Sequence, residues 1–373
     1  MLLNAQDWRE AAKRRLPRFV FDYIDGTADD GQCHQRNRSD LDALTLAPRV
    51  LVDTSQLDMR VQVLGQPWAL PFGIAPTGLN GLIRPGGDGM LAGAAAKLGV
   101  PFALSTASNM RLEQVRQLAP GGTQWMQLYV MHRAIAERIV VRAQEAGYQA
   151  LVLTVDVPVG GHRERDVRHG FKLPFNPSMK LAWDVCTHPA WALDLARSGT
   201  PEFVNLQSDA DGPASPEVQA ALLTRAMDRT LAWDSLRWLR ELWKGPLLLK
   251  GVLRHDDARR AIDHGVDGLI VSNHGGRQMD AAPSAISVLP QVVSAVEGKI
   301  PVMMDGGIRR GSDMAKALAL GASGVFIGRP ALFALAVAGQ AGVEQLLVQY
   351  RMDLERTLIL LGVRNIDELR SLI

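Results

Sequence analysis

The sequence predicts an α/β fold in which eight parallel βα units close into a barrel, a (β/α)8 or TIM barrel, with an N-terminal helical cap and a long insertion after the fourth strand. Three observations predict this class. Short apolar segments alternate with helical patterns, eight of them can be counted, and polar residues gather at one end of nearly all. We expect one domain over residues 1–373, with residues 1–70 as the cap and residues 157–232 as the insertion.

The strand candidates are apolar runs bounded by glycine, proline or polar residues, as in buried parallel strands. The length of 373 residues allows one large barrel or two ordinary domains, and the count of eight strands decides for the barrel. The predicted strands are Pro71 to Thr77, Pro101 to Thr106, Thr123 to Tyr129, Ala150 to Asp156, Pro246 to Val252, Gly268 to His274, Pro301 to Gly307 and Gly324 to Pro330.

Helical patterns fill the spaces between these strands. His132 to Gly147 and Arg254 to Gly265 are the clearest, and both close on glycine, as helices often do. GGDGMLAG, Gly86 to Gly93, loosely resembles a dinucleotide-binding fingerprint, but it leads into an alanine-rich stretch and predicts a helix start. In the cap, a helix is expected over Gln6 to Arg15 and a second one through Tyr23.

Polar residues interrupt the apolar strands almost only at their C-terminal ends. Any strand becomes polar where it meets solvent, but a whole set at one end predicts the functional face of the barrel, since the active sites of such barrels lie there. The set comprises Thr77, Ser105, Gln127, Tyr129, Thr154, Asp156, Lys250, Ser272, His274, Asp305 and Arg329.

The insertion ends in a stretch rich in Pro, Gly, Ser and Asp, and its middle reads MKLAWDVCTHPAWALDLARSG. Trp183, Trp191 and several leucines stand there beside Lys180 and Arg197. Two interpretations remain open: an amphipathic surface that lies on a membrane, through residues 175–213, or a lid helix packed on the barrel.

Composition excludes several classes of protein. The net charge of +2 comes from 41 basic and 39 acidic residues without a block of like charge, so no nucleic-acid partner is expected. Cys33 and Cys186 form no Cys-x-x-Cys pattern, which argues against a disulfide framework or a metal site. The N-terminus carries charges where a signal peptide needs an apolar core, and no apolar run approaches a membrane span. We therefore expect a cytoplasmic protein, with peripheral attachment to the inner face of the membrane left open.

The sharpest motif is SNHGGRQMD, Ser272 to Asp280, at the end of the sixth strand. Two glycines after His274 let the backbone approach a ligand closely, and Arg277 follows them. Arginine binds a carboxylate in a bidentate manner while a neighbouring base faces the adjacent carbon or hydroxyl. A lone barrel histidine is usually a core residue, but this pairing predicts proton abstraction from a carboxylate-bearing substrate.

A second motif, DGGIRRGSD from Asp305 to Asp313, is followed by IGRP, Ile327 to Pro330. Glycine-rich turns after the seventh and eighth strands form the usual phosphate site of these barrels, and Arg309 or Arg329 adds positive charge. The pattern alone fits FMN, a nucleotide or a sugar phosphate.

With QLYV (Gln127 to Val130) and TVDVPVGGHRERD (Thr154 to Asp166) added to both motifs, the chain resembles the FMN-dependent α-hydroxy acid oxidase and dehydrogenase family from about Asp7 to its C-terminus. PTGLNG (Pro76 to Gly81) and LSTASNM (Leu104 to Met110) look most like the members that oxidise (S)-mandelate. The resemblance implies FMN as cofactor, an L- or (S)-α-hydroxy acid as substrate, oxidised to the keto acid, and a homotetramer.

The resemblance also implies roles for individual residues. His274 would be the base, and Asp156 would hydrogen-bond it and stabilise the imidazolium. Substrate would be bound by Tyr23, Tyr129, Arg163, Arg277 and the space beside Ala107. Lys250 would place positive charge where reduced flavin gathers negative charge. Further cofactor contacts would come from Thr77, Gly78, Ser105, Gln127, Thr154, Ser272, Asp305, Gly307, Arg309, Gly328 and Arg329.

Two positions bear on specificity. The oxidases of the family generally have alanine where this chain has Gly78, and glycine there resembles a dehydrogenase that passes electrons to an acceptor other than oxygen, such as a quinone. Glycolate oxidase has a tryptophan where this chain has Ala107, so room for a phenyl group is expected.

Other functions stay open on the sequence alone. L-lactate dehydrogenase and glycolate-type oxidase would use the same residues with a smaller substrate. Barrels that bind FMN for isomerisation would not need His274, Arg277 and Arg163 together. A catalytically silent barrel that binds a phosphate ligand or a membrane would keep the glycine turns but not the base.

Overall fold

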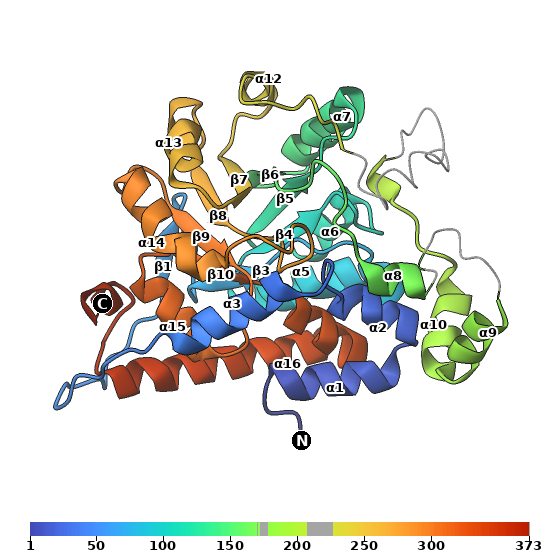
Figure 1. Ribbon diagram of the computed structural model, residues 1–373, viewed down its shortest axis with the longest axis horizontal. Coiled ribbons are helices and arrows are strands. Elements are labelled where there is room, and N and C mark those ends of the chain that lie inside the picture. The colour runs from blue at the N-terminus through green and yellow to red at the C-terminus, as the bar shows by residue number, and fades with distance from the viewer. Residues whose placement is uncertain (170, 172–177, 207–226, 373) are drawn as a thin grey trace.

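Eight parallel strands form a closed barrel in the computed structural model, which describes residues 1–169, 171, 178–206 and 227–372 (Figure 1). Around the barrel each strand pairs with the next in sequence, and the last pairs with the first. The strands are β3 Phe72–Ile74, β4 Phe102–Ser105, β5 Gln124–Leu128, β6 Ala150–Thr154, β7 Leu247–Val252, β8 Gly268–Val271, β9 Val302–Asp305 and β10 Gly324–Ile327. All eight predicted strands are confirmed, and most are shorter than predicted, because several polar residues at their C-terminal ends lie beyond the paired backbone.

Helices surround the barrel and connect its strands (Figure 1). The predicted helices at 132–147 and 254–265 are confirmed as α7 and α13, and the predicted start at 86–93 is confirmed as α5. The helices between or after barrel strands are α4 Asn80–Ile83, α5 Gly87–Leu98, α6 Leu112–Leu118, α7 Arg133–Glu145, α12 Ser235–Leu242, α13 His255–Asp263, α14 Ala285–Val296, α15 Gly311–Ala319 and α16 Arg329–Leu361, with a 3-10 turn at Asp367–Leu372.

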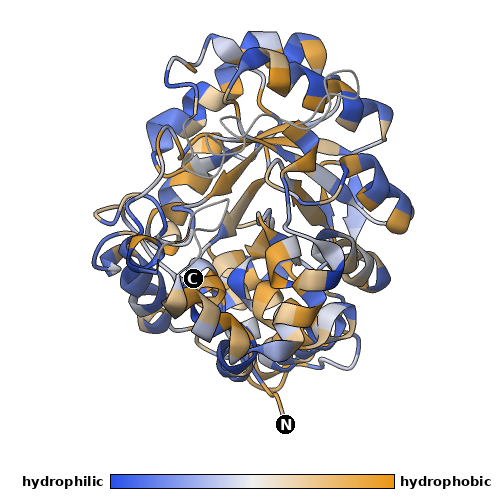
Figure 2. Cartoon of the chain, turned by 90° about the vertical axis from the view of Figure 1, so that its right-hand side faces the viewer, coloured by the Kyte–Doolittle hydropathy of each residue, from blue (hydrophilic) through white to orange (hydrophobic). Residues whose placement is uncertain are grey.

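Side chains alternate between the two faces of each strand, so one sequence builds two cores. In β6, Ala150 and Val152 belong to the cluster that fills the barrel, while Leu151 and Leu153 belong to the larger cluster under the helices. The inner cluster also includes Trp125, Leu248, Ile270, Met303 and Phe326. In Figure 2 apolar residues dominate the strands, whereas the outer helices alternate apolar and polar residues.

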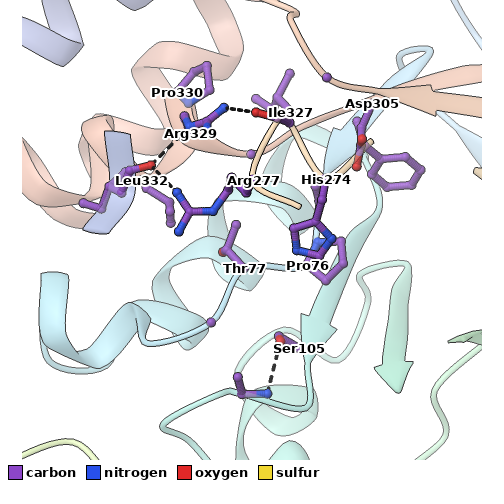
Figure 3. Close-up of a pocket in the computed structure, with 18 of the residues that line it drawn as sticks. Pro76, Thr77, Ser105, His274, Arg277, Asp305, Ile327, Arg329, Pro330 and Leu332 are labelled. Carbon is purple, nitrogen blue, oxygen red and sulfur yellow. Dashed lines mark hydrogen bonds between the residues drawn. The ribbon is translucent and has the colours of Figure 1, made fainter. Parts of the chain in front are cut away.

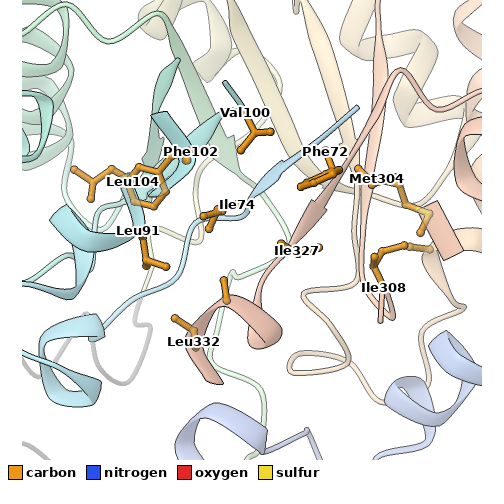
Figure 4. Packing of buried hydrophobic residues seen from close by; sticks show 14 of the residues in the cluster. Phe72, Ile74, Leu91, Val100, Phe102, Leu104, Met304, Ile308, Ile327 and Leu332 are labelled. Atoms are coloured by element: carbon orange, nitrogen blue, oxygen red, sulfur yellow. The ribbon is translucent and has the colours of Figure 1, made fainter. Parts of the chain in front are cut away.

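The larger cluster joins barrel and helices into one core. Phe72, Phe102 and Met304 of the strands belong to it together with the helix residues Leu91 and Leu332 (Figure 4). Full burial of each such side chain stabilises the fold by about 1.5–3 kcal/mol. This continuous packing holds the strand ends, and hence the site, in fixed positions.

The cap contains more structure than the sequence predicted. Its two expected helices are confirmed as α1 Ala5–Arg15 and α2 Arg18–Asp25, and α1 lies along α16 (Figure 1). A third helix, α3 Gln32–Ala43, and a hairpin of β1 Val61–Val63 and β2 Gln66–Trp68 were not anticipated. Trp68 of the hairpin packs against Trp125 and Phe326 in the inner cluster.

The described part of the insertion forms α8 Glu164–Arg168, α9 Met179–Cys186 and α10 Pro189–Ser198, followed by a 3-10 turn at Val204–Leu206. The ends of the predicted membrane segment, residues 175–177 and 207–213, lie outside the described residues. The pair α9 and α10 lies beside α2 (Figure 1), and Trp191 of α10 also donates its indole N–H to the Leu82 carbonyl of α4 at 2.8 Å. Trp191 is buried against Phe19 of α2, and Asp184 accepts a hydrogen bond from the Arg18 backbone N–H at 3.0 Å.

Helix α16 is long and apolar enough to cross a membrane by length and composition, which the sequence reading did not anticipate. However, 61% of its most apolar window is buried inside the protein, and it packs against α1 and α5. A kink at Ala338 and Gly339 also interrupts its helical geometry. These contacts identify it as a core helix of the barrel.

Candidate functional site

A polar layer lies directly above the apolar filling of the barrel. In several strands, a residue two positions after an inner apolar side chain points into the same space, since the side-chain period of a strand is two. Trp125 is thus followed by Gln127, Leu248 by Lys250, and Met303 by Asp305. The layer comprises Ser105, Gln127, Thr154, Lys250, Ser272 and Asp305, and all six are buried.

Neighbouring strands are linked through this layer by hydrogen bonds. The Ser105 hydroxyl donates to Gln127 Oε1 at 3.1 Å, and Gln127 Nε2 donates to Thr154 Oγ1 at 2.9 Å. Buried polar groups that satisfy one another are held in one arrangement. These three side chains therefore form a rigid polar strip on β4, β5 and β6.

Lys250 is a buried cation with two partners in the same layer. Its ammonium group lies 2.9 Å from Asp305 Oδ2 and donates to Ser272 Oγ at 2.8 Å. Burial alone would lower the pKa of Lys250, but the carboxylates of Asp305 and Asp156 raise it above its usual value. Lys250 thus keeps its positive charge inside the barrel.

His274 stands between a carboxylate and a phenol. Its Nδ1 lies 3.2 Å from both oxygens of Asp156, and its Nε2 lies 3.4 Å from the Tyr129 hydroxyl. A carboxylate at Nδ1 favours the proton on that nitrogen, which leaves the lone pair of Nε2 facing the cavity side of the ring. This is the arrangement of a general base with an orienting partner.

The backbone is adapted to place this pair. His274 has a φ of 57°, a left-handed conformation that costs a residue with a side chain on the order of 1 kcal/mol. Gly251 has a φ of 107°, and a Cβ there would lie 2.6 Å from the Asp156 Cβ. Glycine at position 251 thus allows Asp156 to lie against β7 at the height of His274.

Arg277, Arg309 and Arg329 lie beside the glycine-rich turns and line the same cavity. Figure 3 shows Arg277 and Arg329 side by side. Burial first, and then the neighbouring guanidinium groups of Arg277 and Arg309, lower the pKa of Arg329 to about 9. Such crowding of buried positive charge is unfavourable unless an anion offsets it. Together with the left-handed Gly306 and Gly307, this cluster fits the phosphate of a cofactor such as FMN.

Arg277 and Arg329 also hold the cap to the barrel. Arg277 donates to the backbone carbonyls of Tyr23, Ile24 and Gly26, and Arg329 donates to those of Ile24 and Gly26. These carbonyls end α2, where a helix carries partial negative charge. The cap helix is therefore fixed over the cavity by the same cations that line it.

The cap also contributes to the wall of the cavity. Tyr23 lines it, stacks on Phe171 with ring centroids 4.6 Å apart, and donates its hydroxyl to the Gly78 carbonyl at 3.2 Å. A Cβ on Gly78 would lie 2.7 Å from the Ala107 Cβ, so these two small residues, which both line the cavity, pack directly against each other.

The structure brings the predicted site residues together at one end of the barrel. Asp156, Gln127, Thr154 and Ser272 lie behind the others and do not line the cavity. Those that line it are Tyr23, Thr77, Gly78, Ser105, Ala107, Tyr129, Arg163, Lys250, His274, Arg277, Asp305, Gly307, Arg309, Gly328 and Arg329. Their individual roles remain predictions.

Sequence reasoning missed the apolar part of the lining. Ile24, Leu79, Phe203 and Leu332 all face the cavity. They come from the cap, the turn after β3, the insertion and α16, and nothing in their local sequence distinguishes them from ordinary core residues. Only the fold brings them to the site.

Comparison with known sequences places the chain among flavoenzymes. Residues 12–373 match the family described as FMN-dependent dehydrogenase. The (S)-mandelate dehydrogenase of Pseudomonas putida is 47% identical over 368 residues, which cover 99% of this chain and 92% of that protein. An L-lactate dehydrogenase of Chromohalobacter salexigens is 40% identical over 374 residues, which cover 100% of this chain and 95% of that protein.

Comparison with solved structures leads to the same family. A crystal structure of monotopic membrane protein (S)-mandelate dehydrogenase superposes with a TM-score of 0.94 at 46% identity, covering 99% of this chain and 97% of that one. A mandelate oxidase bound to (S)-4-hydroxymandelic acid superposes with a TM-score of 0.86 at 35% identity, covering 100% and 98%. Fold and sequence coincide over nearly the whole length, and the chain belongs to the FMN-dependent dehydrogenase family.

Proposed function

We propose that this protein oxidises (S)-mandelate to benzoylformate, with FMN as its cofactor and His274 as its base. The observation that carries the proposal is the geometry around His274. Its Nδ1 is held by Asp156 at 3.2 Å, its Nε2 faces Tyr129 at 3.4 Å, and Arg163 and Arg277 line the same cavity. The identity of 47% to an (S)-mandelate dehydrogenase supports the choice of substrate.

Oxidation of an α-hydroxy acid removes two electrons and two protons from the substrate. FMN, when bound, would supply the acceptor for the two electrons and for one of the two protons. His274 takes up a proton at Nε2, and the negative charge of Asp156 stabilises the imidazolium that results. Tyr129 orients the substrate hydroxyl beside Nε2.

The substrate carboxylate requires positive charge close to the base. Arg163 and Arg277 supply it from the insertion and from the turn after β8, and both line the cavity. A guanidinium group binds a carboxylate through two parallel hydrogen bonds, which fixes the α-carbon as well as the charge. Tyr23 adds a hydroxyl from the cap.

FMN would be held by the polar layer and the arginine cluster. Ser105 would contact its ring, with Thr77 and Gly78 beside it, while Gln127 and Thr154 would hold Ser105 in place from behind and Ser272 would support Lys250. Asp305, Gly307, Arg309, Gly328 and Arg329 would hold its ribityl chain and phosphate. Lys250 would keep a positive charge beside the ring.

Replacing Lys250 by methionine is expected to weaken FMN binding at least about tenfold, because a buried charge-assisted contact is lost and Asp305 is left without its cation. The dissociation constant is measured by flavin fluorescence during titration of the stripped enzyme. The control is Lys299→Met, since Lys299 is exposed and pairs with Glu297 on the surface. Equal affinity in the Lys250 variant would contradict the placement of Lys250 against FMN.

The proposed function is tested by anaerobic absorbance spectroscopy of the purified holoenzyme. (S)-mandelate is added to one cuvette and L-lactate to another, and the bleaching of the flavin bands is followed. Faster bleaching by (S)-mandelate supports the proposal. A flavin that neither acid bleaches, or lactate favoured more than tenfold, would overturn it.

Oxidation of L-lactate is the second candidate, because relatives at about 40% identity are named L-lactate dehydrogenases. The small side chain of Ala107 in the cavity wall favours mandelate, since a larger residue there would take up the room that a phenyl group needs.

We also propose that α9 attaches the protein to a membrane and that a membrane quinone accepts the electrons. Met179 and Trp183 of α9 are 92% and 74% exposed, and Leu193 of α10 is 50% exposed. Exposed apolar side chains on short helices suit insertion at a membrane interface. The likeness to a monotopic membrane protein supports this placement.

Replacing Met179 and Trp183 together by serine is expected to reduce binding to vesicles of anionic phospholipid at least about tenfold, because two exposed apolar side chains no longer enter the interface. Binding is measured by co-sedimentation. The control is Leu118→Ser, which alters an exposed apolar residue on α6. Undiminished binding by the double variant would exclude α9 as the attachment surface.

The homotetramer implied by family resemblance also stays a proposal. The mass of the holoenzyme in solution, measured by light scattering, tests it against the chain mass of 40.6 kDa.

A further inference from the structure

The insertion contributes an aromatic side chain to the cavity. Phe203 lies shortly after α10, is 2% exposed, and lines the cavity together with Tyr23, Ala107 and His274. It therefore belongs both to the core under the insertion and to the wall of the site.

The segment that carries Phe203 is fixed to the barrel on both sides of this residue. Asn109 Nδ2 donates to the Glu202 carbonyl at 2.9 Å. Asn205 accepts from the Leu112 backbone N–H and donates to the Met110 carbonyl, each at 2.9 Å. Both anchors join the segment to the loop after β4.

The same loop carries Ala107, two residues before Asn109. The insertion is thus tied to the strand end that carries Ala107, which lines the same cavity as His274. Asn205 is 2% exposed, and both of its amide atoms are used, so it fixes the position of the segment rather than meeting solvent.

We propose that Phe203 is a specificity-determining residue that packs against the aromatic group of the substrate, and that Asn205 is the positioning residue that holds it there. This inference rests on the proposed oxidation of (S)-mandelate and adds the insertion to the substrate site. A phenyl ring in the space beside Ala107 gains an aromatic neighbour, whereas the methyl group of lactate is too small to fill the same space.

The test compares (S)-mandelate with L-lactate in the holoenzyme of Phe203→Leu. Leucine keeps the residue apolar but removes the ring. The ratio of kcat/KM for mandelate to that for lactate should fall about tenfold, with the lactate value changing less than about threefold. Phe203→Met is the second variant, because its flexible chain fills the buried volume if leucine prevents folding.

Leu206→Ala is the matched control. Leu206 belongs to the same 3-10 turn region and is also 2% exposed, but it does not line the cavity. In this variant the ratio of kcat/KM for mandelate to that for lactate should stay within about threefold of the wild-type ratio. Asn205→Ala should lower the ratio as Phe203→Leu does, mainly through the KM for mandelate, because the chemistry at His274 is untouched.

An unchanged ratio in folded, FMN-loaded Phe203 variants would overturn the inference, as would an equal fall in Leu206→Ala. A wild-type enzyme that does not oxidise mandelate would instead overturn the proposed function. The activity of the wild-type enzyme on mandelate therefore distinguishes a failure of this inference from a failure of the proposed function.

Discussion

Replacing His274 by glutamine is expected to slow the anaerobic reduction of FMN by (S)-mandelate on the order of 10³-fold. Glutamine can still form hydrogen bonds, but it has no nitrogen that takes up a proton at neutral pH. Asp305 is the other potential base among the described residues that line the cavity, and its carboxylate is paired with Lys250 at 2.9 Å.

The reduction is measured by stopped-flow absorbance at saturating substrate. The flavin content of the variant should equal that of the wild type, because the predicted FMN contacts come from other residues. His255→Gln is the control, since His255 is exposed on α13 at the outside of the barrel. A His274 variant that keeps the wild-type rate would favour a barrel that binds FMN or a phosphate ligand without using this histidine.

The barrel and its polar layer were predictable from sequence because both follow from local periodicity. Eight apolar runs with helical patterns between them specify the barrel. A step of two residues along a strand then carries the chain from the apolar filling at Trp125 to the site at Gln127, and from Leu248 to Lys250. SNHGGRQ identifies His274 as a candidate base, because two glycines that allow close approach of a ligand and an arginine that can bind a carboxylate follow it directly.

The cap and the insertion were not predictable to the same depth. The helix pair α9 and α10 has the amphipathic pattern of either a lid or a membrane segment, and only tertiary contacts show that Trp191 faces α2 while Trp183 faces outward. Phe203 was missed for the same reason. An apolar residue in a long connection carries no local signal for the partner it meets.

Helix α16 is a case in which the local sequence suggests a function that the tertiary contacts exclude. Length and composition fit a membrane span, but burial against α1 and α5 assigns it to the core. The composition of an apolar helix fits both a membrane span and a buried core helix, and its packing against neighbouring helices decides between the two.

Replacing Asp156 by asparagine is expected to lower kcat for (S)-mandelate on the order of 10²-fold, with little change in KM. Asp156 does not line the cavity, and both of its carboxylate oxygens lie 3.2 Å from His274 Nδ1. An amide in this place can present its own N–H to Nδ1, which would move the ring proton to Nε2 and block the base. It also removes the negative charge that stabilises the imidazolium. Steady-state and stopped-flow rates measure both effects.

The double variant with His274→Gln decides whether Asp156 acts as a positioning residue. If Asp156 works only through the imidazole, adding Asp156→Asn to His274→Gln should cost no further rate, because residues that act as one unit are not additive. Asp256→Asn is the control, since Asp256 pairs with Arg254 on the exposed end of α13. A double variant slower than His274→Gln by the full 10²-fold, on the order expected of the single change, would show that Asp156 acts on the substrate or on FMN by another route.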